Sequence, residues 1–166
     1  MFIGEGPGAQ EDQQGKPFVG PAGHLLSELL ESVGLSRGEV FITNMVKCRP
    51  PNNRDPYPNE ISACNEHLEA QIAIIRPKAI VPLGSHALRH WFPHERISKV
   101  HGTTQNYQNI RISPQYHPAA ALHNPSLKSV LRADFKTLAN ALNDTNQHSE
   151  DRANEVLPSE YQIGLL

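Results

Sequence analysis

Short apolar runs alternate with leucine-rich segments of helical period along most of this chain. The apolar runs, which we interpret as strands, occupy residues 1–4, 40–46, 79–83 and 110–113. The helical patterns, with apolar residues three and four positions apart, occupy residues 22–32, 60–75, 85–91 and 126–142. Because strands that alternate with helices join by right-handed crossovers, the pattern predicts a three-layer α/β/α fold around a central, mostly parallel, four-stranded sheet.

Three residues in or beside these segments predict local features. The run at residues 79–83 is apolar throughout, as is typical of a strand covered on both faces. Pro82 in this run donates no ladder hydrogen bond, so we expect a bulge or a strand end there. Asn59 is the expected N-cap of the second helix, and Gly34 is the expected stop of the first helix.

The length of 166 residues and the ordinary apolar content are typical of one soluble domain. No apolar run approaches the length that spans a bilayer, and the first residues lack the pattern of a secretory signal, so we expect a cytoplasmic protein without membrane contact. We divide the chain into one domain at residues 1–142 and a polar, poorly ordered tail at residues 143–166.

The net charge of −2 conceals an uneven distribution. From residue 144 onward there are five acidic residues and one basic residue, so the rest of the chain carries a net charge of +2. A mildly positive body is compatible with nucleic-acid binding but does not by itself indicate it.

A glycine-rich segment follows the first strand, with GEGPG at residues 4–8 and GKPFVGPAG at residues 15–23. Such a loop lets the backbone approach a ligand closely. It lacks the Lys-Ser/Thr ending of a P-loop and the glycine spacing of a dinucleotide site, so glycine content alone does not identify a ligand. Parallel sheets bind ligands beyond the carboxyl ends of their strands, and this segment lies there.

Four motifs in a fixed order are more specific. The four are the two glycine-rich strings above, then TNMVKCRPP at residues 43–51, and last YHPA at residues 116–119. They resemble the motifs of the family 4, iron–sulfur type of uracil-DNA glycosylase. The resemblance covers residues 1–142. It implies the fold of that family and a monofunctional DNA glycosylase that flips uracil out of DNA, hydrolyses its N-glycosidic bond and starts base excision repair. It also implies uracil-containing DNA as the partner, and we expect a monomer.

The resemblance implies four substrate-binding residues. Phe18 would stack on the flipped base, which offsets part of the cost of unstacking by about 1–3 kcal/mol. Asn44 would read the edge of uracil, because its amide offers one donor and one acceptor. Gly6 lies in the same binding loop, and Glu11 matches the acidic residue that blocks the 5-methyl group of thymine.

Two residues match catalytic positions of the family. His117 would stabilise the departing uracil anion as a hydrogen-bond donor, either neutral or charged. Glu5 would hold or polarise the attacking water. Gly6 stands where a better-studied glycosylase family has an aspartate, so we expect weak general-base catalysis and a larger share for leaving-group stabilisation. We expect the other eight histidines to be surface or packing residues.

The loop after His117 matches the segment that the family inserts into DNA. Its candidate residues are Pro118, Ala121 and Leu122, with Leu122 as the apolar wedge. Alanines stand where the family often has larger residues, and His123 replaces a frequent arginine. These departures weaken the expectation of duplex penetration but not that of pocket chemistry.

Cys48 and Cys64 match two of the four thiolate ligands of the family's 4Fe-4S cluster. The Cys-x-x-Cys pair that the family has before its first motif is absent from this sequence. A truncated start explains this better than a genuine loss of the cluster, because the first strand begins partway through. Two cysteines alone do not hold such a cluster.

Two alternatives to the enzyme stay open at this point. One is a protein that binds uracil-DNA without turnover, either by cross-linking to the abasic sugar or as an inactive remnant. The cross-linking branch uses a histidine in a basic loop after the asparagine strand, and residues 47–54 contain none. The other alternative is a nucleotide-binding α/β domain of another kind.

Overall fold

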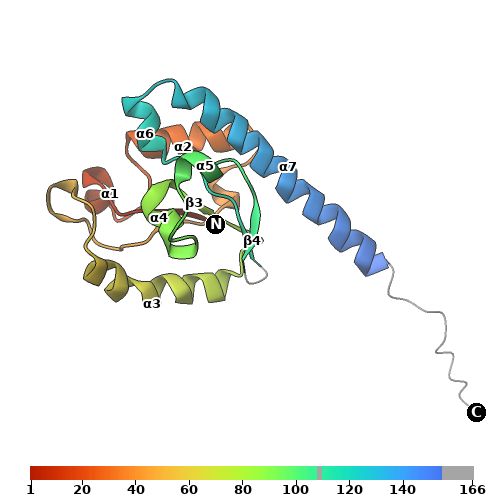
Figure 1. The fold of residues 1–166 in the computed structure, drawn as a ribbon, viewed down its shortest axis with the longest axis horizontal. Helices are drawn as coiled ribbons and strands as arrows, with labels where there is room; N and C mark the ends of the chain where they lie inside the picture. The colour runs from red at the N-terminus through yellow and green to blue at the C-terminus, as the bar shows by residue number, and fades with distance from the viewer. Residues whose placement is uncertain (108–109, 155–166) are drawn as a thin grey trace, which may run out of the picture.

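The computed structural model describes residues 1–107 and 110–154, with side chains through residue 143, and shows one sheet in the order β2-β1-β3-β5-β4 (Figure 1). The strands are β1 (Phe2–Gly4), β2 (Ile42–Asn44), β3 (Ala79–Pro82), β4 (Gln105–Tyr107) and β5 (Ile110–Ile112). β2, β1, β3 and β5 run parallel, and β4 pairs antiparallel with β5 at the sheet edge. The four predicted strands and the mostly parallel α/β fold are confirmed.

The sheet has five strands rather than the predicted four. β4 was missed because its residues, Gln105 to Tyr107, are polar or exposed and carry no apolar run. An edge strand of this kind is held by backbone pairing with its neighbour, here by the register of Asn106 with Arg111.

Seven α-helices and two short 3-10 helices connect the strands within the described residues. The α-helices are α1 (Ala9–Gln14), α2 (Pro21–Glu31), α3 (Pro58–Ile75), α4 (Gly84–Trp91), α5 (Ile97–Val100), α6 (Pro118–His123) and α7 (Leu127–Asn154), and the 3-10 helices are η1 (Arg37–Glu39) and η2 (Pro51–Asn53). The four predicted helices are present as α2, α3, α4 and α7. The short helices α1, α5 and α6 were missed.

The ends of two helices differ from the prediction. α3 starts at Pro58, so its N-cap is Tyr57 and not Asn59. Proline is suited to the first helical position because its φ is already helical, and the side chain of Glu60 accepts the N–H of Tyr57 at 2.7 Å. α7 continues to Asn154, beyond the predicted end at residue 142. Residues 155–166 of the predicted tail lie outside the described residues, and the division at residue 142 stays a prediction.

Pro82 is the last residue of the central strand β3, in line with the predicted strand end. The N–H groups of Val81 and Leu83 donate to the carbonyls of Met1 and Ile3, at 2.8 Å each, and so join β3 to β1. Pro82 only has to accept, and its carbonyl takes the N–H of Gln115 at 3.0 Å. The missing proline N–H therefore leaves the pairing with β1 intact.

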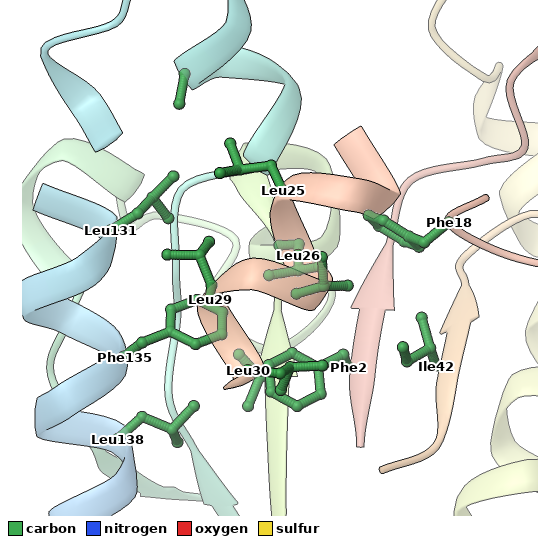
Figure 2. Packing of buried hydrophobic residues seen from close by; sticks show 13 residues of the cluster. Phe2, Phe18, Leu25, Leu26, Leu29, Leu30, Ile42, Leu131, Phe135 and Leu138 are labelled. Atoms are coloured by element: carbon green, nitrogen blue, oxygen red, sulfur yellow. The ribbon is translucent and has the colours of Figure 1, made fainter. Parts of the chain in front are cut away.

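Two apolar cores lie on the two faces of the sheet. On one face, α2, α6 and α7 pack over side chains of β1, β2 and β3, and Figure 2 shows Phe2, Leu26 and Phe135 at the centre of this core. The rings of Phe2 and Phe135 stack with centroids 5.9 Å apart. On the opposite face, α3 and α4 cover Ile3 and Ile80. The helices on both faces confirm the three-layer arrangement (Figure 1).

No helix within the described part of the chain is both long enough and apolar enough to cross a membrane.

Candidate active site

Three residues from separate segments converge at the carboxyl ends of β1 and β2. A Cβ atom placed on Gly4, the last residue of β1, would lie 2.5 Å from Oδ1 of Asn44 and 2.7 Å from the ring of Phe18. Because glycine leaves this point open, the Asn44 amide and the Phe18 ring can border one small space. This space lies beyond the carboxyl ends of parallel strands, as the sequence predicts.

Phe18 has a left-handed backbone with a φ of +54°. This conformation costs a non-glycine residue about 1–2 kcal/mol. Gly23 in α2 makes room for it, because a Cβ there would collide with the Phe18 carbonyl group. Oε1 of Glu11 accepts the N–H groups of Val19 and Gly20, at 2.9 and 2.7 Å, directly after Phe18. The Glu11 carboxylate thus holds the turn that orients the ring.

Burial by itself would raise the pKa of the Glu11 carboxyl group. N–H groups of the surrounding loop, above all that of Gly20, oppose this effect and hold the pKa of Glu11 below its ordinary value. The group is therefore ionised at neutral pH, as an acceptor of two N–H bonds needs to be. Sequence reasoning did not reveal this role in shaping the loop.

Asn44 is the last residue of β2 and is only 5% exposed. Its Oδ1 is buried and has no hydrogen-bond partner among the described residues. Nζ of Lys47 fixes the backbone, since it donates to the carbonyl of Asn44 at 2.8 Å and to Oγ1 of Thr43 at 3.0 Å. A buried acceptor left unpaired costs about 1–3 kcal/mol, and a ligand with an N–H donor would remove that cost.

His117 is the N-cap of α6, and its Nδ1 accepts the N–H of Ala119 at 3.1 Å. Its ring stacks on Phe18 with 5.5 Å between the centroids. Burial lowers the pKa of His117 to about 4, against a smaller opposing effect of the Glu11 carboxylate. The imidazole is therefore neutral at neutral pH, and since Nδ1 accepts, its proton is on Nε2. Burial thus favours the neutral form of the ring, whose charge the sequence left open.

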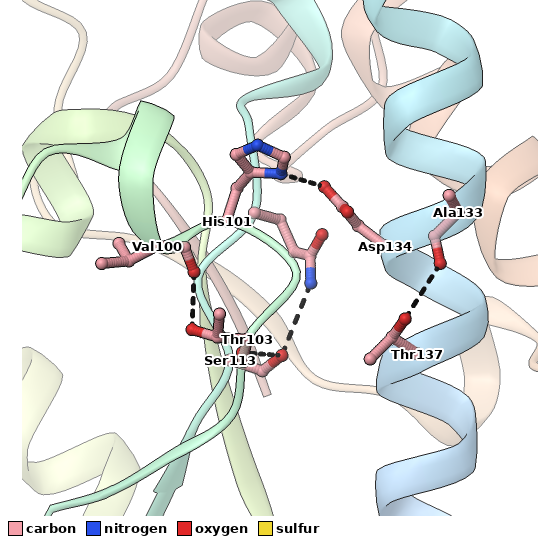
Figure 3. Close-up of polar contacts among 8 residues, drawn as sticks. Val100, His101, Thr103, Ser113, Ala133, Asp134 and Thr137 are labelled. Atoms are coloured by element: carbon pink, nitrogen blue, oxygen red, sulfur yellow. Dashed lines mark hydrogen bonds and ion pairs between the residues drawn. The ribbon is translucent and has the colours of Figure 1, made fainter.

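Contacts on two sides hold the segment that carries His117. On one side, Gly84 has a φ of +87°, and a Cβ there would lie 3.0 Å from Cβ of His117. On the other side, the ring of His101 lies 4.5 Å from that of Tyr116. Figure 3 shows His101 joined to Asp134 of α7, with Nδ1 and Oδ2 2.7 Å apart. α7 therefore supports the site although it contributes no residue to it.

Glu5 and Gly6 follow directly after β1. The Glu5 carbonyl accepts the N–H of Val46 at 3.0 Å, which continues the pairing of β1 with β2 into the loop. A Cβ on Gly6 would lie 2.8 Å from Cγ2 of Val46, so a larger residue does not fit without displacing Val46. The Glu5 carboxylate is half-buried, and burial raises its pKa, while His86 opposes and Asp55 adds to this effect.

A pocket of about 380 Å³ opens beside these residues. Glu11 and Asn44 are among its lining residues, together with Lys47 and parts of the loop after β1. Phe18 and His117 do not line this pocket, and their rings stack on each other beside it. The structure thus places Asn44 and Phe18 next to Gly4, with His117 on Phe18 and Glu11 in the pocket lining.

The predicted DNA-inserting residues differ in exposure. Pro118 is buried at the first position of α6. Ala121 is fully buried in the core beside α2 and α7, so its side chain points into the protein. Leu122 is 43% exposed and is the large apolar side chain of α6 that faces solvent.

The two cysteines come from neighbouring segments of the chain. Cys48 lies in the loop after β2, and Cys64 lies in α3. Cys48 is exposed and Cys64 is partly buried, and both are free thiols. The N–H of Lys47 donates to Sγ of Cys64 at 3.4 Å, a type of bond that also tunes cluster-bound thiolates. A cluster of four irons normally takes four thiolates, and the two cysteines of this sequence alone do not supply them.

Sequence reasoning missed His86 and Asp55. His86 was expected among the surface or packing histidines, yet its Nε2 lies 3.8 Å from Oε2 of Glu5 and 3.3 Å from Oδ2 of Asp55. A signal was present, because His86 follows the carboxyl end of a predicted parallel strand, where ligands bind in such folds.

Comparison with known proteins places this arrangement in context. The sequence profile of the Uracil DNA glycosylase superfamily matches residues 1–144. A type-4 uracil-DNA glycosylase of Saccharolobus solfataricus is 51% identical over 152 residues, which cover 86% of this chain and 70% of the relative. The type-4 enzyme of Sulfurisphaera tokodaii is 49% identical over 148 residues, covering 83% and 67%. The type-4 enzyme of Thermotoga maritima is 48% identical over 141 residues, covering 82% and 73%.

Proposed function

The chain belongs to the uracil-DNA glycosylase superfamily, and on that premise we propose how the residues around Gly4 carry out its reaction. The protein is a uracil-DNA glycosylase, which hydrolyses the N-glycosidic bond between uracil and deoxyribose in DNA. Free uracil and an abasic site are the products, and base excision repair starts from them. The observation that carries the assignment of the site is the buried, unpaired Oδ1 of Asn44 beside the Phe18 ring.

Uracil has to leave the base stack to reach this site. The ring of Phe18 offers a stacking surface worth about 1–3 kcal/mol. Oδ1 of Asn44 accepts a hydrogen bond from N3–H of uracil. Cytosine has an acceptor at N3, so it would face Oδ1 without a hydrogen bond and leave the buried oxygen unpaired. Asn44 therefore selects uracil.

Cleavage of the glycosidic bond builds positive charge on the sugar and negative charge on the departing uracil. The neutral His117 ring donates its Nε2–H to O2 of uracil as that negative charge develops. The carboxylate of Glu5 orients the water that attacks C1′. Because Gly6 supplies no further acid, stabilisation of the leaving group carries the larger share of the rate.

Glu11 has two roles in this proposal. By resemblance it blocks the 5-methyl group of thymine, and its position in the lining of the pocket supports this. Its bonds to Val19 and Gly20 also keep the Phe18 ring in place. The two roles are separable by experiment, because one affects the choice of base and the other affects every substrate.

Leu122 enters the duplex as the apolar wedge in this proposal, since its side chain is exposed at the end of α6. Pro118 and Ala121 are buried and shape the helix that presents it. In this proposal the protein acts as a monomer.

Cys48 and Cys64 would hold two of the four ligand positions of a 4Fe-4S cluster, as the resemblance implies. When bound, such a cluster would tie the loop after β2 to α3 and so serve a structural purpose. Neither cysteine contacts the bond that is broken in the steps above, so those steps need only the other residues of this chain.

A single assay tests the function. The protein is incubated with an oligonucleotide that contains one uracil, and the product is heated in alkali. Cleavage at the uracil position is the expected result. A heat-stable adduct between protein and DNA would instead indicate the cross-linking alternative, and an unchanged oligonucleotide would indicate an inactive remnant.

Replacement of Asn44 by aspartate tests the assigned role. We expect uracil release to fall roughly 5- to 150-fold, the effect of losing a buried hydrogen bond of about 1–3 kcal/mol, and release of cytosine to rise relative to it. Asn59→Asp, at an exposed position of α3, is the matched control. An unchanged ratio of uracil to cytosine release would remove Asn44 from the base-binding site.

A further inference from the structure

Glu5, Asp55 and His86 form a compact cluster from three separate segments. Glu5 follows β1, Asp55 lies between η2 and α3, and His86 lies in the first turn of α4. One side-chain nitrogen or oxygen atom of each residue lies within 4.8 Å of the corresponding atoms of the other two. The His86 imidazole faces both carboxylates, with Nε2 3.8 Å from Glu5 and 3.3 Å from Asp55.

Other ionisable groups on the adjoining segments are engaged elsewhere. Arg54, next to Asp55 in sequence, forms a bidentate pair with Glu60 at 2.8 and 2.7 Å. Nζ of Lys47 binds oxygen atoms of Thr43, Asn44 and Gln71. His117, on α6, is neutral and stacks on Phe18. The charges that face Glu5 in the described structure are therefore those of His86 and Asp55.

Resting on the function proposed above, we propose that His86 and Asp55 are positioning residues that set the charge of the Glu5 carboxylate. The ionised carboxylate is acceptor-only and accepts a hydrogen bond from the attacking water more strongly than the neutral acid does. A protonated His86 favours that form by its positive charge, whereas Asp55 disfavours it by its negative charge. The two residues act on Glu5 with opposite signs, and neither touches the nucleobase.

The position of Glu5 gives this pair its importance. Burial works against the charged form of Glu5, so the pKa of its carboxyl group lies above the ordinary range. His86 opposes this effect, and its side chain is itself 29% exposed. The side chain of Asp55 is 76% exposed, so water screens its effect more strongly. We therefore expect His86 to have the larger influence.

The experiment measures the pH dependence of kcat for the full chain with a uracil-containing oligonucleotide, in the presence of EDTA, for His86→Gln and Asp55→Asn. The acidic limb of the profile should move upward by roughly half to one pH unit in His86→Gln, the size of a partly screened ion pair. It should move downward, by less, in Asp55→Asn. His90→Gln is the matched control, because His90 lies on the same helix and pairs with Glu69 at 3.2 Å, away from Glu5.

A second readout does not depend on turnover. Titration of the Glu5 carboxyl carbon by NMR should show the same two shifts of opposite direction, and His90→Gln should show none. Acidic limbs and Glu5 titrations that coincide in wild type and both variants would overturn the positioning role. Wild-type protein that releases no uracil would refute the glycosylase function itself, and the NMR titration would still decide whether His86 and Asp55 control Glu5.

Discussion

Replacing Glu11 by alanine tests how the Phe18 ring is held in the site. Oε1 of Glu11 accepts the N–H groups of Val19 and Gly20 at 2.9 and 2.7 Å, directly after a residue with a φ of +54°. Without the carboxylate, both N–H groups lose this acceptor and the strained turn can relax. The ring then leaves its place beside Gly4, and every substrate that needs to stack on it is affected.

The size of the effect follows from the two bonds. A hydrogen bond to a charged group contributes about 1.5–3 kcal/mol, and both bonds here are partly exposed, so Glu11→Ala should cost about 2–3 kcal/mol. Glu11→Gln keeps an acceptor oxygen without the charge and should cost about 1 kcal/mol. Because about 1.4 kcal/mol corresponds to a factor of ten, uracil release by the alanine variant should fall roughly 30- to 100-fold.

Urea unfolding and kcat/KM for uracil release measure the two consequences, with Gln13→Ala at an exposed position of α1, outside the pocket lining, as the control. The pKa of Glu11 is lowered in the folded protein, so its stabilisation is present above the ordinary glutamate pKa and is lost as the pH falls through the folded value. The gap between wild type and variant should therefore close in acid. Wild-type stability and uracil release in Glu11→Ala would refute the reasoning, and a gain of thymine release alone would assign Glu11 to base selection only.

Two further substitutions test other parts of the site. Burial lowers the pKa of His117 to about 4. Between this value and the ordinary histidine pKa, the unfolded chain binds a proton that the folded protein does not. The free energy of unfolding is therefore full above about pH 6.5 and decreases by up to about 3 kcal/mol toward pH 4. His117→Gln should flatten this dependence in urea unfolding, and a wild-type slope would contradict the buried, neutral ring. Leu122→Ala should lower kcat/KM on duplex DNA more than on single strands, and an equal change on both substrates would exclude a wedge role.

The apolar pattern of the sequence determines the framework of the fold. The apolar runs predicted as strands form β1, β2, β3 and β5, and their side chains contribute to the cores on both faces of the sheet. The leucine stripes of α2 and α7 lie in one of these cores. These features are predictable because burial of apolar side chains depends on local periodicity. The polar edge strand β4 and the six-residue helices α1 and α6 carry no such period, and pairing or packing with neighbours produces them.

Sequence by itself also determined which residue types stand in the loops of the site. Phe18, Asn44 and His117 were identified from their motifs, and the structure places Asn44 and Phe18 next to Gly4 and His117 on the Phe18 ring. The sequence could not show that Phe18 has a positive φ or that Glu11 holds this turn, since the bonds of Glu11 form only once the loop is folded.

Only the tertiary structure decided the protonation of His117 and the partners of Glu5. The neutral imidazole follows from burial and from the N–H of Ala119 on Nδ1, neither of which is a property of a sequence motif. His86 approaches Glu5 because α4 follows directly after β3, and β3 pairs with β1 although the two strands are far apart in the sequence. Local pattern thus determines which segments are buried, whereas distances between charged and hydrogen-bonding groups depend on how those segments pack.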